Sequence, residues 1–510
     1  MGGRVHKSML NAEVNLLFYF LSLFLTFFSR KIFLDNLGAE FMGLTGTLNN
    51  ILGYLNLSEL GISACIGYFL FKPLQSDNRE EIQKILSLLG YLYRWIGSVI
   101  LAGAFIISLF FPLIFSDASL SLPIIYFAFY SFLGSSLIGY FINYRQILLS
   151  ADQKNYLVAI YYQSARLVKL ALQIYLAYTY RNLYVWVIIE FFFAVIGCII
   201  LNWKINKEYP WLKVDICQGR QLLKDYPEII TKTKQVFIHK IKDFVLVKSD
   251  ELFIFLFVSL KMVAFYGNYM IIISKLISLF SSITGSVGAS VGNLVAEGNK
   301  PRMLKVFWEY TTIQHTIAAT LTFSLYTLLE PFICHWLSPE YVMDHRILVL
   351  LVLYIYITNS RNSVDSFNYA HGLYGDVWSA WAELGINITI TIICGLQWGI
   401  IGILLGKLAS LLTIVVLWKP YYLFTAGFKE SVRQYWSGVM RNYAISAFSI
   451  GTSVWLLRFI PFSPYTSIGL WVAYAAVSMT LFLVIDLTAT LLFAKGAKDS
   501  FYRIKNMRKR

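Results

Sequence analysis

The sequence predicts an all-α polytopic membrane protein with about 14 transmembrane helices, on three observations. First, 57% of the 510 residues are hydrophobic and 14% are charged, whereas a soluble domain is typically about 25% charged. Second, apolar residues form continuous runs of the about 20 residues that a helix needs to cross a bilayer. Third, these runs lack the alternating, roughly 10-residue pattern of an outer-membrane barrel. The spans are therefore expected to be helical.

Polar breaks divide the apolar sequence into fourteen expected spans. Their approximate limits are 13–34, 42–71, 88–116, 121–148, 155–178, 182–203, 234–258, 264–292, 303–329, 346–370, 377–397, 398–424, 437–459 and 466–494. The pattern is weakest at the seventh span, which is dense in charge, and at the break over residues 395–399. The first run has no small-residue cleavage site after it, so we expect it to remain as a membrane helix.

Basic residues mark one side of this topology. The segment 204–234 carries seven Lys and Arg residues and the tail 495–510 carries another seven, whereas the loops on the opposite side hold few. The positive-inside rule therefore predicts that both termini are cytoplasmic and that the number of spans is even, which fourteen and twelve both satisfy. We interpret the net charge of +15 in this way and expect no nucleic-acid partner.

The central hydrophilic segment also predicts the domain organisation. It separates six spans from eight, and many transporters are built from repeated halves. We expect an N-lobe at 1–204 (helices 1–6), a cytoplasmic linker at 205–233, a C-lobe at 234–424 (helices 7–12), and helices 13–14 with a basic tail at 425–510. Residues 40–46 (EFMGLTG) and 261–267 (KMVAFYG) are a faint echo of such a repeat.

Common catalytic and metal-binding patterns do not occur. The five cysteines include no CxxC pair, the six histidines form no HExxH, and no GxxxxGK[ST] loop is present. Residues 288–292 (GASVG) match GxSxG by letter, but they end an expected membrane helix and are interpreted as small-residue packing. We expect a protein that is not an enzyme, with no catalytic residues, no metal and no cofactor.

Charged residues inside the expected spans indicate a polar pathway. Arg166 and Lys169 lie near the middle of one span, Glu190 lies in the next, and Lys275 lies deep in the eighth. A charge at mid-membrane costs at least ~2.5–3.5 kcal/mol on insertion scales, so such residues usually line a polar cavity. The pattern predicts a protein that moves a polar cargo across a membrane.

Each candidate cation has an alternative structural role. Arg166 and Lys169 share a helix face, either as a cavity-lining pair or in an ion pair with Glu190. Lys275 lines the cavity or pairs with Asp250 or Glu251. Two further substrate-binding candidates carry alternatives of the same kind: Arg30 can extend to the membrane surface, and Arg361 can pair with Asp365, four residues later.

Acidic residues within or near spans are candidates for binding a coupling H+ or Na+. The alternative for each is neutralisation by a neighbouring Lys or Arg. These candidates are Glu59, Glu190, Asp250 and Glu383.

Several stretches, taken in order, resemble the polysaccharide flippases of the multidrug/oligosaccharidyl-lipid/polysaccharide exporter superfamily. In the first half they are residues 30–34 (RKIFL), 37–40 (LGAE), 43–44 (GL) and 56–62 (NLSELGI). In the second half they are 249–251 (SDE), 266–269 (YGNY), 288–293 (GASVGN), 368–373 (NYAHGL), 383–387 (ELGIN) and 399–402 (GIIG). The branch that the chain resembles most is that of the bacterial O-antigen, capsule or exopolysaccharide repeat-unit flippases.

The resemblance implies two six-helix lobes around a central cavity, with two further helices outside. It implies a bacterial cytoplasmic (inner) membrane location and a cargo of undecaprenyl-diphosphate-linked oligosaccharide, carried from the cytoplasmic to the outer leaflet. Expected partners are this lipid-linked cargo, the bilayer, and the polysaccharide polymerase and glycosyltransferases that handle the same sugars. The arginine-rich pattern that the lipid II flippase branch has in its first two helices does not occur, which disfavours a peptidoglycan precursor as cargo.

Two alternative functions stay open at this point. A membrane enzyme such as an O-antigen polymerase or ligase also handles lipid-linked sugars, but it usually has a large external loop, and the longest loop here is predicted to be internal. A multidrug antiporter of the same superfamily expels amphiphilic cations, which a net-basic cavity would repel.

Overall fold

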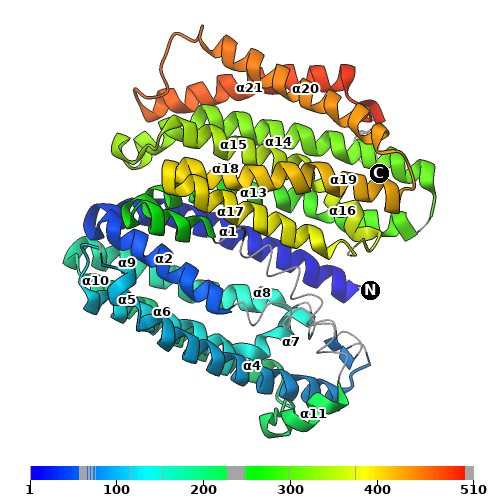
Figure 1. Cartoon of the computed structure of the whole chain (residues 1–510). Coiled ribbons are helices and arrows are strands. Elements are labelled where there is room, and N and C mark those ends of the chain that lie inside the picture. Colours follow the sequence, from blue (N-terminus) through cyan, green and yellow to red (C-terminus); the bar gives the residue numbers. More distant parts are fainter. Residues whose placement is uncertain are drawn as a thin grey trace. The chain divides into compact units, whose positions relative to one another are not determined.

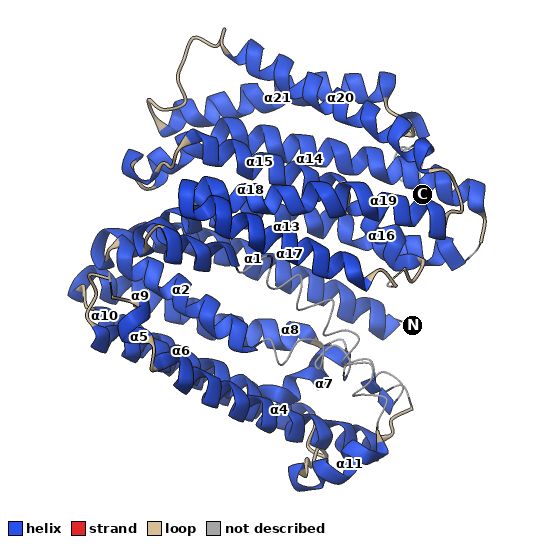
Figure 2. Cartoon of the chain, in the orientation of Figure 1, coloured by secondary structure: helices blue, strands red, loops and turns tan. Residues whose placement is uncertain are grey.

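The computed structural model describes residues 2–56, 66, 69–70, 73–74, 76–116, 118–152, 154–226, 246, 249–296, 298–373 and 375–499. Within these residues every element is a helix (Figure 2). The all-α class expected from the apolar runs is therefore confirmed. The chain forms two compact units, Met1–Ala264 and Phe265–Arg510, and the functional division into lobes, linker and outer helices stays a prediction.

The first unit holds the helices of the first six expected spans (Figure 1). Their bounds are α1 (Gly2–Leu37), α2 (Ala39–Leu55), α4 (Arg79–Ser108), α5 (Phe111–Ile114), α6 (Leu122–Phe141), η2 (Asn143–Arg145), α7 (Gln146–Ala151), α8 (Asn155–Val158), the π-helix η3 (Ala159–Gln163), α9 (Ser164–Tyr180) and α10 (Leu183–Glu208). Two short helices follow, η4 (Ile216–Gln218) and α11 (Gly219–Asp225). The expected spans 42–71 and 234–258 lie partly outside the described residues.

The second unit holds the remaining helices. Helix α13 (Leu260–Ala296) begins in the first unit and continues into the second. It is followed by α14 (Lys300–Trp336), η5 (Pro339–Tyr341), α15 (His345–Ser360), α16 (Asn362–Ala370), α17 (Val377–Trp398), α18 (Ile400–Ser410), the π-helix η6 (Leu411–Trp418), α19 (Lys419–Tyr422), the π-helix η7 (Leu423–Gly427), α20 (Val432–Leu457) and α21 (Ile468–Phe493). Helices α20 and α21 pack together along α14 (Figure 1).

Nine helices or runs of helices among the described residues are long and apolar enough to cross a membrane. The helices α1, α2, α8–η3–α9 and α20 cover further expected spans. A multi-pass membrane protein is the architecture that such lengths require, because a helix satisfies its own backbone hydrogen bonds inside hydrocarbon. The break expected at residues 395–399 is shorter than predicted: α17 continues to Trp398 and α18 begins at Ile400, so that Gly399, with a positive φ of 56°, alone separates them.

Helices α17 and α18 approach each other closely because small residues lie between them. A Cβ added to Gly406 would lie 2.3 Å from Thr391 Oγ1, and one added to Gly402 would lie 2.0 Å from the carbonyl oxygen of Cys394. Without a hydrophobic effect between helices in lipid, such close approach is a main source of packing energy. The spacing of Gly402 and Gly406 therefore fixes this helical hairpin.

The loops predicted to be cytoplasmic gather at one end of each unit. In the first unit, Gln83 donates to the carbonyl of Trp211 at 2.8 Å, and Lys154 pairs with Glu208 at 2.8 Å. In the second, Lys300 pairs with Glu430 at 2.8 Å. The hydrogen bonds place the basic loops of each unit on a common side, which fits the positive-inside distribution. Orientation in a membrane stays a prediction.

Candidate functional site

The charges that the sequence places inside spans of the first unit meet between α9 and α10. Lys169 Nζ donates to Glu190 Oε1 at 2.5 Å, and Gln173 Nε2 donates to Glu190 Oε2 at 3.0 Å and to the carbonyl of Trp186 at 3.2 Å. Gln173 is one helical turn after Lys169, so both reach the same carboxylate. Glu190 is thus held by one cation and one amide, and Lys169 forms the ion pair that is one of its two predicted alternatives.

Arg166 behaves differently from Lys169, although the two are three residues apart. It is exposed, and it forms no hydrogen bond or ion pair with any of the described residues. The π-helix η3 directly precedes α9 and widens the helix before this residue. Such π-segments occur often at functional sites. Arg166 is therefore an exposed guanidinium, within the expected span 155–178, that has no hydrogen bond or ion pair with the described residues.

Arg30 connects α1 to the start of α13 within the first unit. Its Nη2 donates to the carbonyl of Ala264 at 3.0 Å, and the side chain is half-buried. Nearby in the same unit, Asn50 of α2 donates to Glu251 Oε2 at 2.5 Å, and Asp250 is buried. These contacts place polar groups from three segments of the first unit around the beginning of α13. Glu59 lies outside the described residues.

Arg361 marks the break between α15 and α16 in the second unit. Its Nη1 bonds Asp365 Oδ1 at 2.7 Å, which is the pair that the sequence spacing indicates. The side chain of Arg361 is 20% exposed and that of Asp365 is 43% exposed. The Nε of Arg361 is buried and has no hydrogen-bond partner among the described residues. A buried donor left unpaired costs about 1–3 kcal/mol, so a ligand oxygen at this position would be stabilised.

The remaining candidates of the second unit lie on two helices. Lys275 is half-buried on α13, and Glu383 is buried on α17. Asn387 and Thr391 follow Glu383 at intervals of four, and all three are buried, so α17 presents one polar stripe to its neighbours. The interface between α17 and α18 therefore contains polar side chains as well as small ones.

Several buried polar residues are absent from the sequence-based candidates. Lys407 of α18 is 7% exposed, and its Nζ lies 4.7 Å from the ring centre of Tyr354. His315 Nδ1 lies 3.0 Å from the hydroxyl of Tyr356. Asp486 of α21 is 1% exposed and is treated below. For Lys407 and Asp486 the only sequence signal is a single charge inside an apolar run, and for His315 there is none.

No group of three or more His, Cys, Asp or Glu side chains among the described residues has the geometry to hold a metal ion. The polar clusters above instead combine cations, amides and hydroxyls. These groups recognise phosphate and sugar oxygens or carry protons. Binding of an anionic or sugar-bearing ligand and proton transfer are chemistry that such side chains support.

The fold is that of polytopic membrane transporters. A structure described as the lipid II flippase MurJ in an inward closed conformation matches with a TM-score of 0.65 and 15% identity, over 95% of this chain and 98% of that chain. A multidrug resistance MATE family transporter of the MOP superfamily, in an inward-facing conformation, matches with a TM-score of 0.58 and 13% identity, over 81% of this chain and 95% of that chain. At these identities the likeness shows a shared fold.

No family model and no curated protein sequence matches the chain. The two structural neighbours carry different cargoes by their descriptions, a lipid-linked one and drugs. Cargo must therefore be argued from the residues of this chain.

Proposed function

We propose that this protein is a flippase that translocates an undecaprenyl-diphosphate-linked oligosaccharide repeat unit from the cytoplasmic to the outer leaflet by alternating access. The observation that carries the proposal is Arg166, an exposed guanidinium in the expected span 155–178 with no hydrogen bond or ion pair among the described residues. It lies in a chain with a transporter fold. A diphosphate head group is the kind of anion that a guanidinium binds bidentately.

The cargo has two physically different parts. The polyprenyl tail is soluble in lipid, whereas the diphosphate and sugars need hydrogen-bond partners throughout the passage. Arg166 in the first unit and the unpaired Nε of Arg361 in the second supply donors for phosphate oxygens. Transporters of repeated architecture bind cargo between halves and expose it alternately to each side. We infer that each unit offers one arginine to the head group, Arg166 in the first and Arg361 in the second.

The sign of the embedded charge favours this cargo over a drug cation. Lys169 is paired with Glu190 and Arg361 with Asp365, whereas Arg166 has no ion pair among the described residues and so leaves a net positive field around it. A cavity with that field repels amphiphilic cations. The proposal places the protein in a bacterial inner membrane with both termini cytoplasmic, beside the polymerase and glycosyltransferases that use the same lipid carrier.

An enzyme that polymerises or ligates the same sugars is the weaker candidate. The described hydrophilic segment 209–226 packs on the α4 end that is predicted to be cytoplasmic, through Ser87 with Asp215 at 3.0 Å and Glu81 with Tyr226 at 2.5 Å. A segment placed there faces the side where the sugars are assembled, not the side where they are polymerised. We therefore propose transport without catalysis.

The test uses purified protein in liposomes loaded with a polyprenyl-diphosphate-linked oligosaccharide. Appearance of the sugar in the outer leaflet is followed with a membrane-impermeant, sugar-modifying reagent. Loss of a bidentate charge contact costs about 2–5 kcal/mol, so Arg166→Gln should slow transport at least about tenfold. The transport rate of Arg166→Lys should lie between those of the wild type and Arg166→Gln, because lysine keeps the charge but not the planar, bidentate guanidinium group.

The matched control is Arg346→Gln. Arg346 is also exposed, but it lies in the first turn of α15, where it forms its own ion pair with the N-cap residue Asp344 at 2.6 Å. Transport by this variant should equal that of the wild type. Equal transport by Arg166→Gln and wild type, at equal amounts of folded protein, would refute the cargo role. Transport of a cationic dye in place of the lipid-linked sugar would favour the drug antiporter.

A further inference from the structure

A buried carboxyl group lies in the last described helix with no counter-charge. Asp486 of α21 is 1% exposed, and neither carboxylate oxygen has a hydrogen-bond partner among the described residues. The apolar window of α21 has a mean hydropathy of 2.2. An unpaired carboxylate in such surroundings is strongly disfavoured, so the group either takes up a proton or is matched by a bound cation.

The groups that face Asp486 come from three helices. The hydroxyl of Ser449 on α20 faces the carboxyl, and Tyr356 of α15 lies close enough to interact with it electrostatically. From α14, His315 reaches the site through its hydrogen bond to Tyr356. No Lys or Arg among the described residues interacts with Asp486. Its neighbours are therefore proton donors and acceptors without charge.

Asp486 lies in the seam between α14, α15, α20 and α21. The charged groups of this seam lie at its two ends. Glu330 of α14 and Arg458 line a cavity at one end, and Arg441 of α20 interacts electrostatically with Lys495 at the other. Asp486 is seven positions before the end of α21, which is about 10 Å along a helix. Neither pair of end groups neutralises it.

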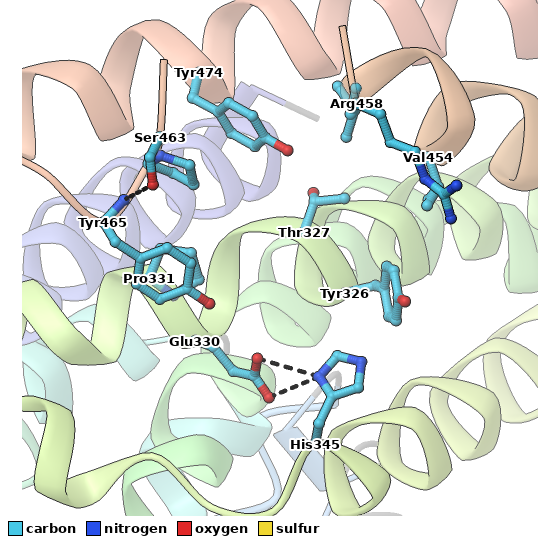
Figure 3. Close-up of a pocket in the computed structure, with 12 residues that line it drawn as sticks. Tyr326, Thr327, Glu330, Pro331, His345, Val454, Arg458, Ser463, Tyr465 and Tyr474 are labelled. Atoms are coloured by element: carbon cyan, nitrogen blue, oxygen red, sulfur yellow. Dashed lines mark hydrogen bonds and ion pairs between the residues drawn. The ribbon is translucent and has the colours of Figure 1, made fainter. Parts of the chain in front are cut away.

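The cavity opens at the end of the helices predicted to face outward. It has a volume of about 330 Å³ and lies between α14, α20, α21 and the start of α15. Figure 3 shows Tyr474 and Arg458 at its wall, with Glu330 bonded to His345 at 3.1 Å. Its lining is polar enough to hold water.

Buried polar groups lead from this cavity towards Asp486. Leu457 of α20 lines the cavity, and Ser453 and Ser449 follow on the same face at successive steps of four residues, about 6 Å each. Both serines are 0% exposed, and neither hydroxyl has a hydrogen-bond partner among the described residues. Buried hydroxyls in proteins are normally hydrogen-bonded, often to water. Ser453, Ser449 and Asp486 are thus three buried polar side chains along one seam, which water molecules can connect into a proton path.

An aromatic pair separates the cavity from the carboxyl. Phe482, one turn before Asp486, stacks on Phe323 of α14 with ring centres 4.5 Å apart, and both rings are fully buried. On its other side the Asp486 site continues towards Arg361. Tyr443 of α20 packs edge-on against His315 at 5.0 Å and lies within reach of Ser360 and Arg361. The seam therefore joins a cavity, an occluded carboxyl and a cargo-binding candidate.

We propose that Asp486 is a proton-binding site of this transporter and that its occupancy is linked through Tyr356, His315 and Tyr443 to Arg361. Binding forms one O–H bond at a carboxylate oxygen, with the proton taken from water that enters by the cavity, and release breaks the same bond. Proton binding at Asp486 stands independently of the cargo. The link to Arg361 rests on the proposed flippase function.

The first experiment measures the proton without any cargo. The carboxylic acid C=O band of the purified protein is followed by infrared difference spectroscopy between about pH 5 and about pH 9. The wild type should gain the band as pH falls, and Asp486→Asn, which has the shape of the protonated acid, should lack that change. Ser478→Ala is the matched control, because Ser478 is a fully buried hydroxyl of α21 that bonds the carbonyl of Ala475; it should titrate as the wild type does.

Two results of the pH titration would overturn the site. The first is a band that persists at every pH, which means an acid that never releases its proton. The second is a titration that Asp486→Asn leaves unchanged. Should Asp486→Asn fail to fold, Tyr356→Phe replaces it and should alter the wild-type titration. Sodium that removes the band at constant pH would assign the site to Na+ and would also overturn the proposal.

The second experiment measures coupling in the liposome assay. A pH gradient should accelerate wild-type transport, and Asp486→Asn should reduce that acceleration about tenfold, within the usual range of coupling between two sites. His315→Gln should act in the same direction because it interrupts the link. An unchanged gradient response in Asp486→Asn would disprove the coupling. Absence of sugar transport by the wild type would disprove the flippase function and leave the infrared result standing.

Discussion

Lys169 and Glu190 form an ion pair at 2.5 Å between α9 and α10, with side-chain exposures of 15% and 26%. The two residues are a lysine and a glutamate that sequence spacing alone leaves free to face a cavity or each other. This pairing distinguishes Lys169 from Arg166, which lies three positions earlier on the same helix. Lys169 therefore has an ion-pair partner inside the protein, whereas Arg166 has none among the described residues and stays a candidate for binding cargo.

Breaking this pair from one side should lower stability. Lys169→Met leaves the Glu190 carboxylate with Gln173 as its donor, and an under-satisfied charged group of this kind costs about 1–3 kcal/mol. Thermal unfolding of the purified protein should therefore begin at a lower temperature. The double variant Lys169→Met with Glu190→Gln should recover most of the loss. Lys84→Met, which breaks the exposed pair with Glu80 at 2.7 Å, should leave the transition unchanged.

Variants of Arg361 and of Asp365 should differ in their transport rates. Both variants, Arg361→Gln and Asp365→Asn, remove the charge–charge attraction of the ion pair at 2.7 Å. Only the first also removes the buried Nε that has no partner among the described residues. We expect Arg361→Gln to slow transport of the lipid-linked sugar at least about tenfold more than Asp365→Asn does. Equal effects of the two variants would reduce Arg361 to a partner of Asp365.

The hairpin of α17 and α18 should not tolerate a methyl group at Gly406. An added Cβ would lie 2.3 Å from Thr391 Oγ1 and 2.7 Å from the Thr391 backbone nitrogen. Overpacking of this kind typically costs about 1–3 kcal/mol. Gly406→Ala should therefore unfold at a lower temperature than wild type. Gly385→Ala on the facing helix has open space within 4 Å and should be neutral, so equal transitions in the two variants would contradict the packing argument.

Asp376 should contribute to stability at neutral pH and lose that contribution in acid. Burial raises the pKa of its carboxyl, but the hydrogen bond and charge of Lys419 and the hydrogen bonds of Ser379 and Trp418 outweigh burial, and the pKa is lowered overall. A depressed folded-state pKa gives stabilisation that is present above the unfolded value of 3.8. It is lost as pH falls through the folded value.

The unfolding temperature of the wild type should therefore fall as pH is lowered from about 5 to about 3. Asp376→Asn should be less stable at neutral pH, because Lys419 loses the partner it holds at 2.7 Å, and less sensitive to acid. Asp77→Asn is the control, since Asp77 is an exposed loop carboxylate, and it should keep the wild-type pH profile. A wild-type profile in Asp376→Asn would refute the assignment.

The helices could be placed from the sequence because hydrophobicity and length are local properties. Runs such as 182–203 and 466–494 coincide with α10 and α21 within a few residues, and the predicted break before Ile400 is present, although Gly399 alone forms it. The embedded charges could also be found, since each interrupts an apolar run. The pair Arg361–Asp365 was open to prediction because both partners lie on one short stretch.

The roles of those charges depended on tertiary structure. Whether Lys169 faces Glu190 is set by the rotation of α9 against α10, and whether Gln173 joins them is set by the same rotation. Asp486 gave no sequence signal beyond its charge, because its neighbours come from α20 and α15, more than thirty positions away in the chain. The sequence by itself determined a helical, multi-pass protein with charges inside its spans. Helix packing alone decided which of them are neutralised, since that depends on distances between side chains that the chain order does not contain.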